Sequence, residues 1–247
     1  MKNLLLLIII AATFFACSNQ KQKQGEKEPV PIVLFEDNFD SDSEGEYIEN
    51  VIGLPEPVGL GIKWKVLPGG QKPVNWILSD ECEPSDPKKG MWVIPADSGY
   101  MHQGGRSKNS VLFANKPVPD DVEHYIIEFK QWRGDNDKIM FVIGAPQPDW
   151  QWSTEIGCEI QVPGTDSTTT DAYVLGSLGN AKIEGVALHH EWADYKIEVK
   201  GENVKWTCND ILMAEGTIEG LKPGYFGIRQ RYERNTFYDD VKITILK

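Results

Sequence analysis

The sequence is dominated by short segments in which hydrophobic and polar residues alternate. These segments lie at 124–133, 138–143, 155–162, 195–199, 204–208, 225–232 and 240–246. In the first of them Tyr125, Ile127 and Phe129 would share one face of a strand. Gly, Pro, Asn and Asp separate the segments, and no stretch of a dozen residues has a helical period. The pattern predicts an all-β protein with a jelly-roll β-sandwich fold.

The region from residue 42 to residue 110 alternates less regularly and is richer in proline and glycine. We expect short strands near Trp64, near Trp76 and at 91–94, with long loops between them. Long loops on a rigid sandwich often carry function.

The N-terminus indicates secretion. Lys2 precedes the apolar run 4–12, which is too short to span a membrane comfortably, and Ala16 precedes Cys17. This arrangement resembles the lipobox of bacterial lipoproteins, which implies cleavage before Cys17 and lipidation of that cysteine. An ordinary signal peptide or an uncleaved anchor is the alternative. Residues 1–16 are therefore predicted to be a lipoprotein signal, 17–31 a flexible tether, and 32–247 a single β-sandwich domain.

Cys17 is followed by Ser18 rather than by the aspartate that retains lipoproteins in the inner membrane of enteric bacteria. We therefore expect a cell-envelope protein held by its lipid on the outer membrane, with the periplasmic or surface face left open. The formal net charge of −12 repels nucleic acid and anionic lipid headgroups. Neither is expected as a partner, so the membrane contact is expected through the lipid alone.

Cys82, Cys158 and Cys208 are the other cysteines, and the sequence leaves open whether any two of them pair. Cys158 and Cys208 sit within apolar alternation and are predicted to be small core residues. The sequence has no serine-nucleophile elbow, phosphate loop or dinucleotide fingerprint. It therefore gives no support for a hydrolase with a serine elbow, for a nucleotide-binding protein or for a dinucleotide-binding protein.

Two polar strands are the best candidates for a site. In the segment 155–162, Glu155, Glu159 and Gln161 share one face with Gly157, which leaves room for a ligand to approach the backbone. The alternative is a solvated outer sheet face.

In the segment 225–232, Tyr225, Gly227, Arg229 and Arg231 share the face opposite to Phe226 and Ile228. Two arginines with a tyrosine suit recognition of hydroxyls, a carboxylate or an oxyanion. Pairing of the arginines with acidic residues on adjacent strands is the alternative.

Aromatic and loop residues extend this candidate site. Tryptophan stacks well on sugar rings, so Trp132, Trp150 and Trp152 are predicted to contact a carbohydrate, with Trp132 beside the groove. His102 and Arg106 lie in a glycine-rich segment and are weaker candidates.

A structural calcium ion is a further possibility that the sequence raises. Glu36 lies at the first strand and Asp240 at the last, and first and last strands often neighbour each other in a jelly roll. Ordinary acidic turns are the alternative, and no other cofactor is expected.

The order of several short motifs resembles a known family. The chain has Gly157-Cys158-Glu159-Ile160-Gln161, then Trp192-Ala193-Asp194-Tyr195 leading to Asn209-Asp210, and finally Gly224-Tyr225-Phe226-Gly227-Ile228-Arg229. This order resembles the concanavalin A-like lectin/glucanase sandwiches, and in particular the 3-keto-disaccharide hydrolase-like group common among Bacteroidetes lipoproteins. Ala193, Asp210 and Arg229 depart from the residues usual in that group.

The resemblance implies a carbohydrate-active envelope lipoprotein that acts on glycosides, with cleavage of a 3-keto-glycoside as one activity. If the protein is catalytic, it is expected to be a glycoside hydrolase or lyase, with Glu159 as base and Arg229 or Arg231 stabilising negative charge. A non-catalytic glycan-binding lipoprotein that uses the same groove stays open. A structural or adhesion protein without a small ligand is the third alternative.

Overall fold

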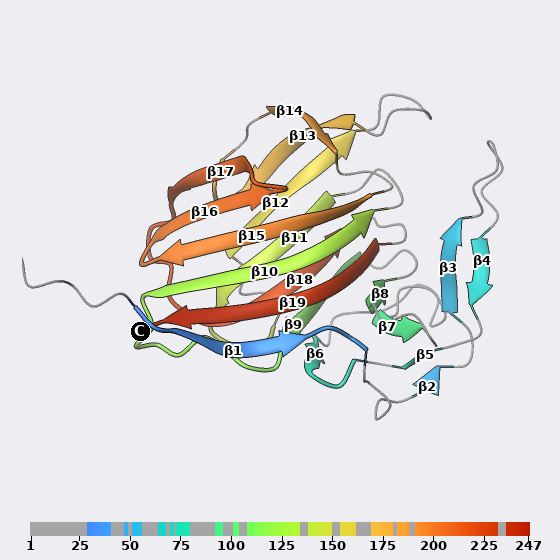
Figure 1. Cartoon of the computed structure of the whole chain (residues 1–247), viewed down its shortest axis with the longest axis horizontal. Coiled ribbons are helices and arrows are strands. Elements are labelled where there is room, and N and C mark those ends of the chain that lie inside the picture. The colour runs from blue at the N-terminus through green and yellow to red at the C-terminus, as the bar shows by residue number, and fades with distance from the viewer. Residues whose placement is uncertain are drawn as a thin grey trace, which may run out of the picture.

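The computed structural model contains two β-sheets packed face to face (Figure 1). It describes residues 29–40, 47–48, 51–55, 64–67, 70–71, 73–79, 92–95, 101–103, 108–133, 138–149, 154–161, 169–179, 182–187, 191–231 and 236–247. All regular secondary structure in these ranges is strand, which confirms the predicted fold class. Within them, no helix is long and apolar enough to cross a membrane.

The first sheet combines both ends of the chain. Its strand order is β17 (Ile211–Thr217), β16 (Asn203–Cys208), β15 (Trp192–Lys200), β10 (His124–Arg133), β19 (Thr236–Leu246), β8 (Met101–Gln103), β7 (Trp92–Pro95), β5 (Gly70–Gln71) and β2 (Tyr47–Ile48). β1 (Pro31–Asp37) also pairs with β19, antiparallel, so the first and last strands are neighbours as expected.

The second sheet carries the two polar strands singled out from the sequence. Its order is β14 (Lys182–Ala187), β13 (Thr169–Gly176), β12 (Thr154–Gln161), β11 (Lys138–Ala145), β18 (Tyr225–Arg231), β9 (Lys108–Ala114) and β6 (Trp76–Leu78). β3 (Val51–Pro55) and β4 (Trp64–Leu67) form a separate antiparallel pair.

The core lies between the two sheets and uses the apolar faces predicted by alternation. β10 contributes Tyr125, Ile127 and Phe129, and the facing sheet contributes Phe141 and Ile228, all of them buried. Phe129 stacks on Tyr195 of β15, with ring centroids 5.1 Å apart. Cys208 is buried in the same core, as predicted.

β9 was not predicted, because it lacks the alternation that marks the other strands. Leu112 and Ala114 face the core, while Val111 and Phe113 are equally buried on the other side. A strand buried on both faces is apolar throughout, so period-2 alternation disappears.

β1 is fixed to the sandwich by a buried carboxylate. The side chain of Asp37 accepts hydrogen bonds from the Trp76 indole (2.9 Å) and from the backbone amide of Phe39 (2.9 Å). Trp76 packs edge-on against Phe35, with ring centroids 5.2 Å apart. These contacts tie the first strand of one sheet to β6 of the other.

Candidate functional site

The register of the second sheet brings the candidate polar positions together on its outer face. Ile156 and Ile228 lie in the core, so Glu159 and Arg231 occupy positions of the opposite phase. Lys138 of β11 is directly paired with both Glu159 and Arg231. The three positions therefore form one row across β12, β11 and β18.

The neighbouring row continues the same arrangement. Met140 of β11 pairs with Gly157 on one side and with Arg229 on the other. Two strand spacings separate β12 from β18, so backbone positions 159 and 231 are roughly 10 Å apart. That span is wide enough for a sugar-sized ligand above β11.

A buried apolar cluster forms the next part of this outer face. Val111, Phe113 and Val142 are each 0% exposed and pack together with Ala145, with Tyr225 beside them. Gly227 of β18 makes this packing possible, because a Cβ at that position would lie 2.7 Å from the Phe113 ring. The absent side chain lets the Phe113 ring pack closely over the backbone of β18.

Arg229 lies on this face between the apolar cluster and the charged row. Its side chain is only 6% exposed. A guanidinium keeps its charge even when it is buried, and solvent screens a buried charge poorly. Arg229 therefore supplies a fixed positive charge within the sheet rather than a mobile surface cation.

A pocket opens at the end of the sheet where β18 begins. Its volume is about 660 Å³, and its lining includes Pro119, Pro146, Lys222 and Tyr225. Tyr225 also contacts the apolar cluster, so the pocket adjoins the outer face that carries Arg229. The loops of this pocket combine flat apolar surfaces with one lysine and one aspartate, Asp120.

The sequence-predicted site residues divide among three places. Glu155, Glu159 and Gln161 occupy the outer phase of β12, on the same sheet face as Arg229 and Arg231. Trp132 and His102 do not join them: they belong to β10 and β8 of the first sheet. The expected position of Trp132 beside the groove is therefore wrong, because alternation predicts the face of a strand but not the sheet that contains it. Trp150, Trp152, Arg106 and Cys17 lie outside the described residues.

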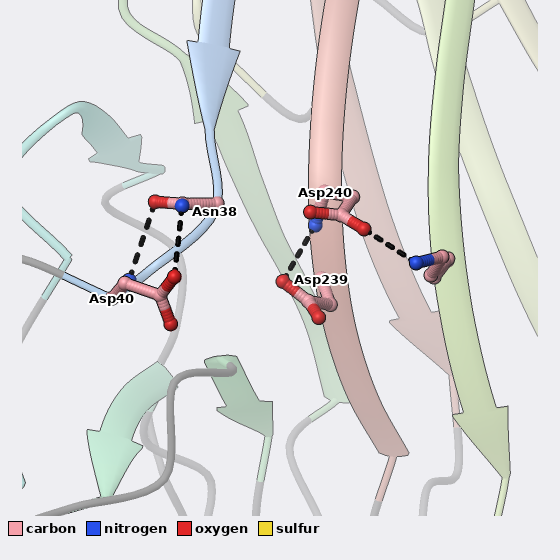
Figure 2. A network of polar contacts seen from close by, with 5 residues as sticks. Asn38, Asp40, Asp239 and Asp240 are labelled. Carbon is pink, nitrogen blue, oxygen red and sulfur yellow. Dashed lines mark hydrogen bonds and ion pairs between the residues drawn. The ribbon is translucent and has the colours of Figure 1, made fainter.

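The acidic positions proposed for calcium are engaged in ion pairs. The Lys130 ammonium lies 2.6 Å from the Asp240 carboxylate, and Lys242 lies 3.5 Å from Glu36. Figure 2 shows Asp239 and Asp240 of β19 beside Asn38 and Asp40, with Asp240 turned toward Lys130. Among the described residues no group of three His, Cys, Asp or Glu side chains could hold a metal ion. A calcium ion held partly by backbone oxygens stays a prediction.

The electrostatics of this acidic group follow from burial and pairing. Partial burial raises the pKa of Asp239, although its side chain accepts a 2.7 Å hydrogen bond from the Asp240 amide. The hydrogen bond to Asp240 raises the pKa of Lys130, with added attraction from the same carboxylate.

Strand pairing brings further residues into the candidate site that the sequence alone did not identify. Lys138 lies between Glu159 and Arg231, and Tyr173 and Asp171 of β13 pair with Glu159 and Gln161. The alternation of 138–143 could have identified Lys138, since it has the opposite phase to Phe141. β13 itself was not predicted, so its residues could not be added.

The fold is an antiparallel β-sandwich whose second sheet carries a row of charged positions on its outer face. The model of the 3-keto-alpha-glucoside-1,2-lyase-like domain matches residues 63–244. The chain belongs to this family and carries its carbohydrate-related domain. No curated protein matches the sequence of this chain.

Two solved structures with TM-scores of 0.51 and 0.50 support the fold. A Bacillus subtilis protein of unknown function with a galectin-like fold is 11% identical, with 90% of this chain and 99% of that chain covered and a TM-score of 0.51. The CBM2 module of the evolved Dit protein of Lactobacillus casei BL23 phage J-1 is 9% identical, with 89% and 97% covered and a TM-score of 0.50. The carbohydrate-binding module CBM66 of Bacillus subtilis is 12% identical, with 68% and 93% covered and a TM-score of 0.45. At these identities the likeness concerns the fold alone.

Proposed function

We propose that this protein cleaves 3-keto-glycosides on the outer face of the second sheet. The proposal rests on the register of the second sheet, which places Glu159, Lys138 and Arg231 in one row of paired positions and Arg229 in the next row. A base and several cations across one narrow span suit a reaction that removes a proton and stabilises the resulting negative charge. Membership in the 3-keto-alpha-glucoside-1,2-lyase-like family supports the same chemistry.

The proposed reaction is an elimination. The ketone at C3 acidifies the C2 proton, which Glu159 removes, and the electrons delocalise onto the ketone oxygen. Arg229 or Arg231 stabilises that enolate. The enolate then re-forms the ketone as a C1–C2 double bond appears and the C1–oxygen bond breaks. The leaving alkoxide takes up a proton, so the products are an alcohol and an unsaturated keto-sugar.

The decisive experiment uses a chromogenic aryl 3-keto-α-glucoside, prepared with hydrogen or deuterium at C2. We expect release of the phenol with a primary isotope effect. Glu159→Gln should lower kcat by at least about 100-fold, the lower end for loss of a general base, while substrate affinity changes little. Glu215→Gln is the matched control, because Glu215 is exposed on β17 of the other sheet.

Unchanged turnover in Glu159→Gln would overturn the assignment of the base. Tight binding of unoxidised glycans with no turnover of any keto-glycoside would instead favour a non-catalytic glycan-binding protein. In that case Glu159→Gln would weaken binding only partly, since a glutamine still offers one acceptor oxygen and a donor.

We also propose that Cys17 is lipidated and holds the domain on the outer membrane. The sequence of residues 1–18 supports this location. Two or three acyl chains give stable anchoring, whereas one chain binds only marginally.

A further inference from the structure

The first sheet carries an aromatic row on its outer face, far from the candidate catalytic strands in the fold. Trp192 of β15 is directly paired with Trp132 of β10, which is paired with Phe237 of β19. Trp132 contacts Phe237 edge-on, with ring centroids 5.5 Å apart. We call Trp192, Trp132 and Phe237 the outer aromatic row.

The exposure of these rings changes along the row. Phe237 is buried, Trp132 is partly exposed, and Trp192 is 44% exposed. Phe237 therefore supports Trp132 from one side, while Trp192 presents much of its ring to solvent. Exposing a large aromatic ring is unfavourable, so an exposed tryptophan beside a second one is a feature that a ligand can use.

A row of charged side chains runs parallel to the aromatic one. Lys130 is paired in register with Asp194 on β15 and with Asp239 on β19. The backbone of β15 at Asp194 is fixed by a 2.8 Å hydrogen bond that the Asp194 amide donates to the Asn209 side chain. The Asp194 side chain itself is exposed. Hydrogen-bonding groups therefore line one edge of an aromatic surface, as recognition of a sugar ring and its hydroxyls requires.

The local charge selects the kind of sugar. Lys130 is ion-paired with Asp240 at 2.6 Å, and in the register of the sheet it is flanked by two further carboxylates, those of Asp194 and Asp239. This surface repels anionic glycans, and the net charge of the chain adds to the repulsion. Carboxylates accept hydrogen bonds from neutral hydroxyls without such a cost.

We propose that the outer aromatic row is a second binding surface, specific for neutral glycans. It lies on a different sheet from Glu159 and Arg229, so it does not depend on the proposed lyase activity. Binding there would keep the protein on a polysaccharide while the other face acts on, or binds, a smaller sugar.

The test is affinity electrophoresis of the purified protein in gels containing dextran, laminarin, xyloglucan or galactomannan, with alginate as the anionic probe. We expect at least one neutral polysaccharide to retard the wild-type protein. Trp192→Ala should weaken that binding about tenfold, and Trp192→Phe should restore part of it. Alginate should not retard the protein.

Two controls separate this surface from the candidate catalytic face. Leu212→Ala removes another exposed apolar side chain of the same sheet and should leave retardation unchanged. Glu159→Gln should also leave it unchanged. The proposal is wrong if no neutral polysaccharide shows binding that depends on Trp192. It is also wrong if Trp192→Ala changes only the sedimentation of the protein, because the row would then be a contact between copies of the chain.

Discussion

Replacing Gly144 with alanine should destabilise the fold strongly, because two independent penalties coincide there. Gly144 has a φ of +67°, and a Cβ would lie 2.3 Å from the backbone oxygen of Lys222 and 2.9 Å from the Leu221 side chain. The left-handed conformation costs alanine about 1–2 kcal/mol. Overpacking costs about 1–3 kcal/mol more, and the backbone oxygen cannot move away by side-chain rotation. We therefore expect a loss of about 2–5 kcal/mol in the free energy of unfolding.

Gly179→Ala is the matched control. Gly179 has a φ of +85°, but nothing lies within 4 Å of a Cβ built there. The Gly179→Ala variant should therefore lose only the cost of the left-handed conformation, about 1–2 kcal/mol in the free energy of unfolding. Both substitutions reduce the entropy of the unfolded chain in the same way, so that effect largely cancels in the comparison.

The stability of both variants is measured by urea unfolding and by thermal melting, each followed by tryptophan fluorescence. For a chain of this size each kcal/mol shifts Tm by roughly 2–4 °C, so Gly144→Ala should melt at least about 2 °C below Gly179→Ala. Equal melting temperatures and equal urea midpoints would refute the reasoning, since they would mean that the loop containing Lys222 moves aside without cost.

Three further changes test other parts of the chain. Asp37→Ala leaves the buried Trp76 indole and the Phe39 amide without their present acceptor, so urea unfolding should show a loss of about 2–4 kcal/mol, and Asp37→Asn should lose less. Burial raises the pKa of Asp239, so its contribution to stability falls as pH rises through that raised pKa; the Tm advantage of Asp239→Asn over the wild type should therefore be larger at pH 7 than at pH 3. Cys17→Ser should give unlipidated precursor or a secreted form, and an unchanged mass in the membrane fraction would contradict lipidation.

Strands with one buried face could be predicted from the sequence almost to the residue. Alternation predicted 124–133, and β10 has these bounds, because Tyr125, Ile127 and Phe129 are buried while Glu128 is exposed. β9 and the edge strand β17 do not follow this rule. β9 is buried on both sides, and β17 exposes both Ile211 and Leu212, so neither shows a clean alternation.

The composition of the candidate site could be predicted only within single strands. Alternation gives Arg229 and Arg231 the same phase, and both positions lie in β18. It cannot show that Lys138 lies between Glu159 and Arg231, since β11 pairs both with β12, which follows it in the chain, and with β18, which lies much further along the chain. The expectation that Trp132 lies beside the groove fails for the same reason, because Trp132 belongs to β10 of the other sheet. Strand order is a property of the whole chain.

The outer faces of the two sheets differ in how deeply their residues are buried. This difference bears on whether the polar strands of the second sheet are simply a solvated outer face. Over β10 and β15 the outer positions away from the outer aromatic row include charged, exposed residues such as Glu128 and Lys196, which is how a sheet face in contact with water is built. The outer positions of β9, β11 and β18 include Val111, Val142 and Arg229, all buried. Water does not cover these three positions, so the second sheet is not an ordinary solvated face there. A buried guanidinium keeps its charge and needs a partner to offset the free energy that burial costs, and Arg229 has such a partner. The outer face of the second sheet at these positions is therefore packed and polar at once, unlike the exposed charged positions of the first sheet.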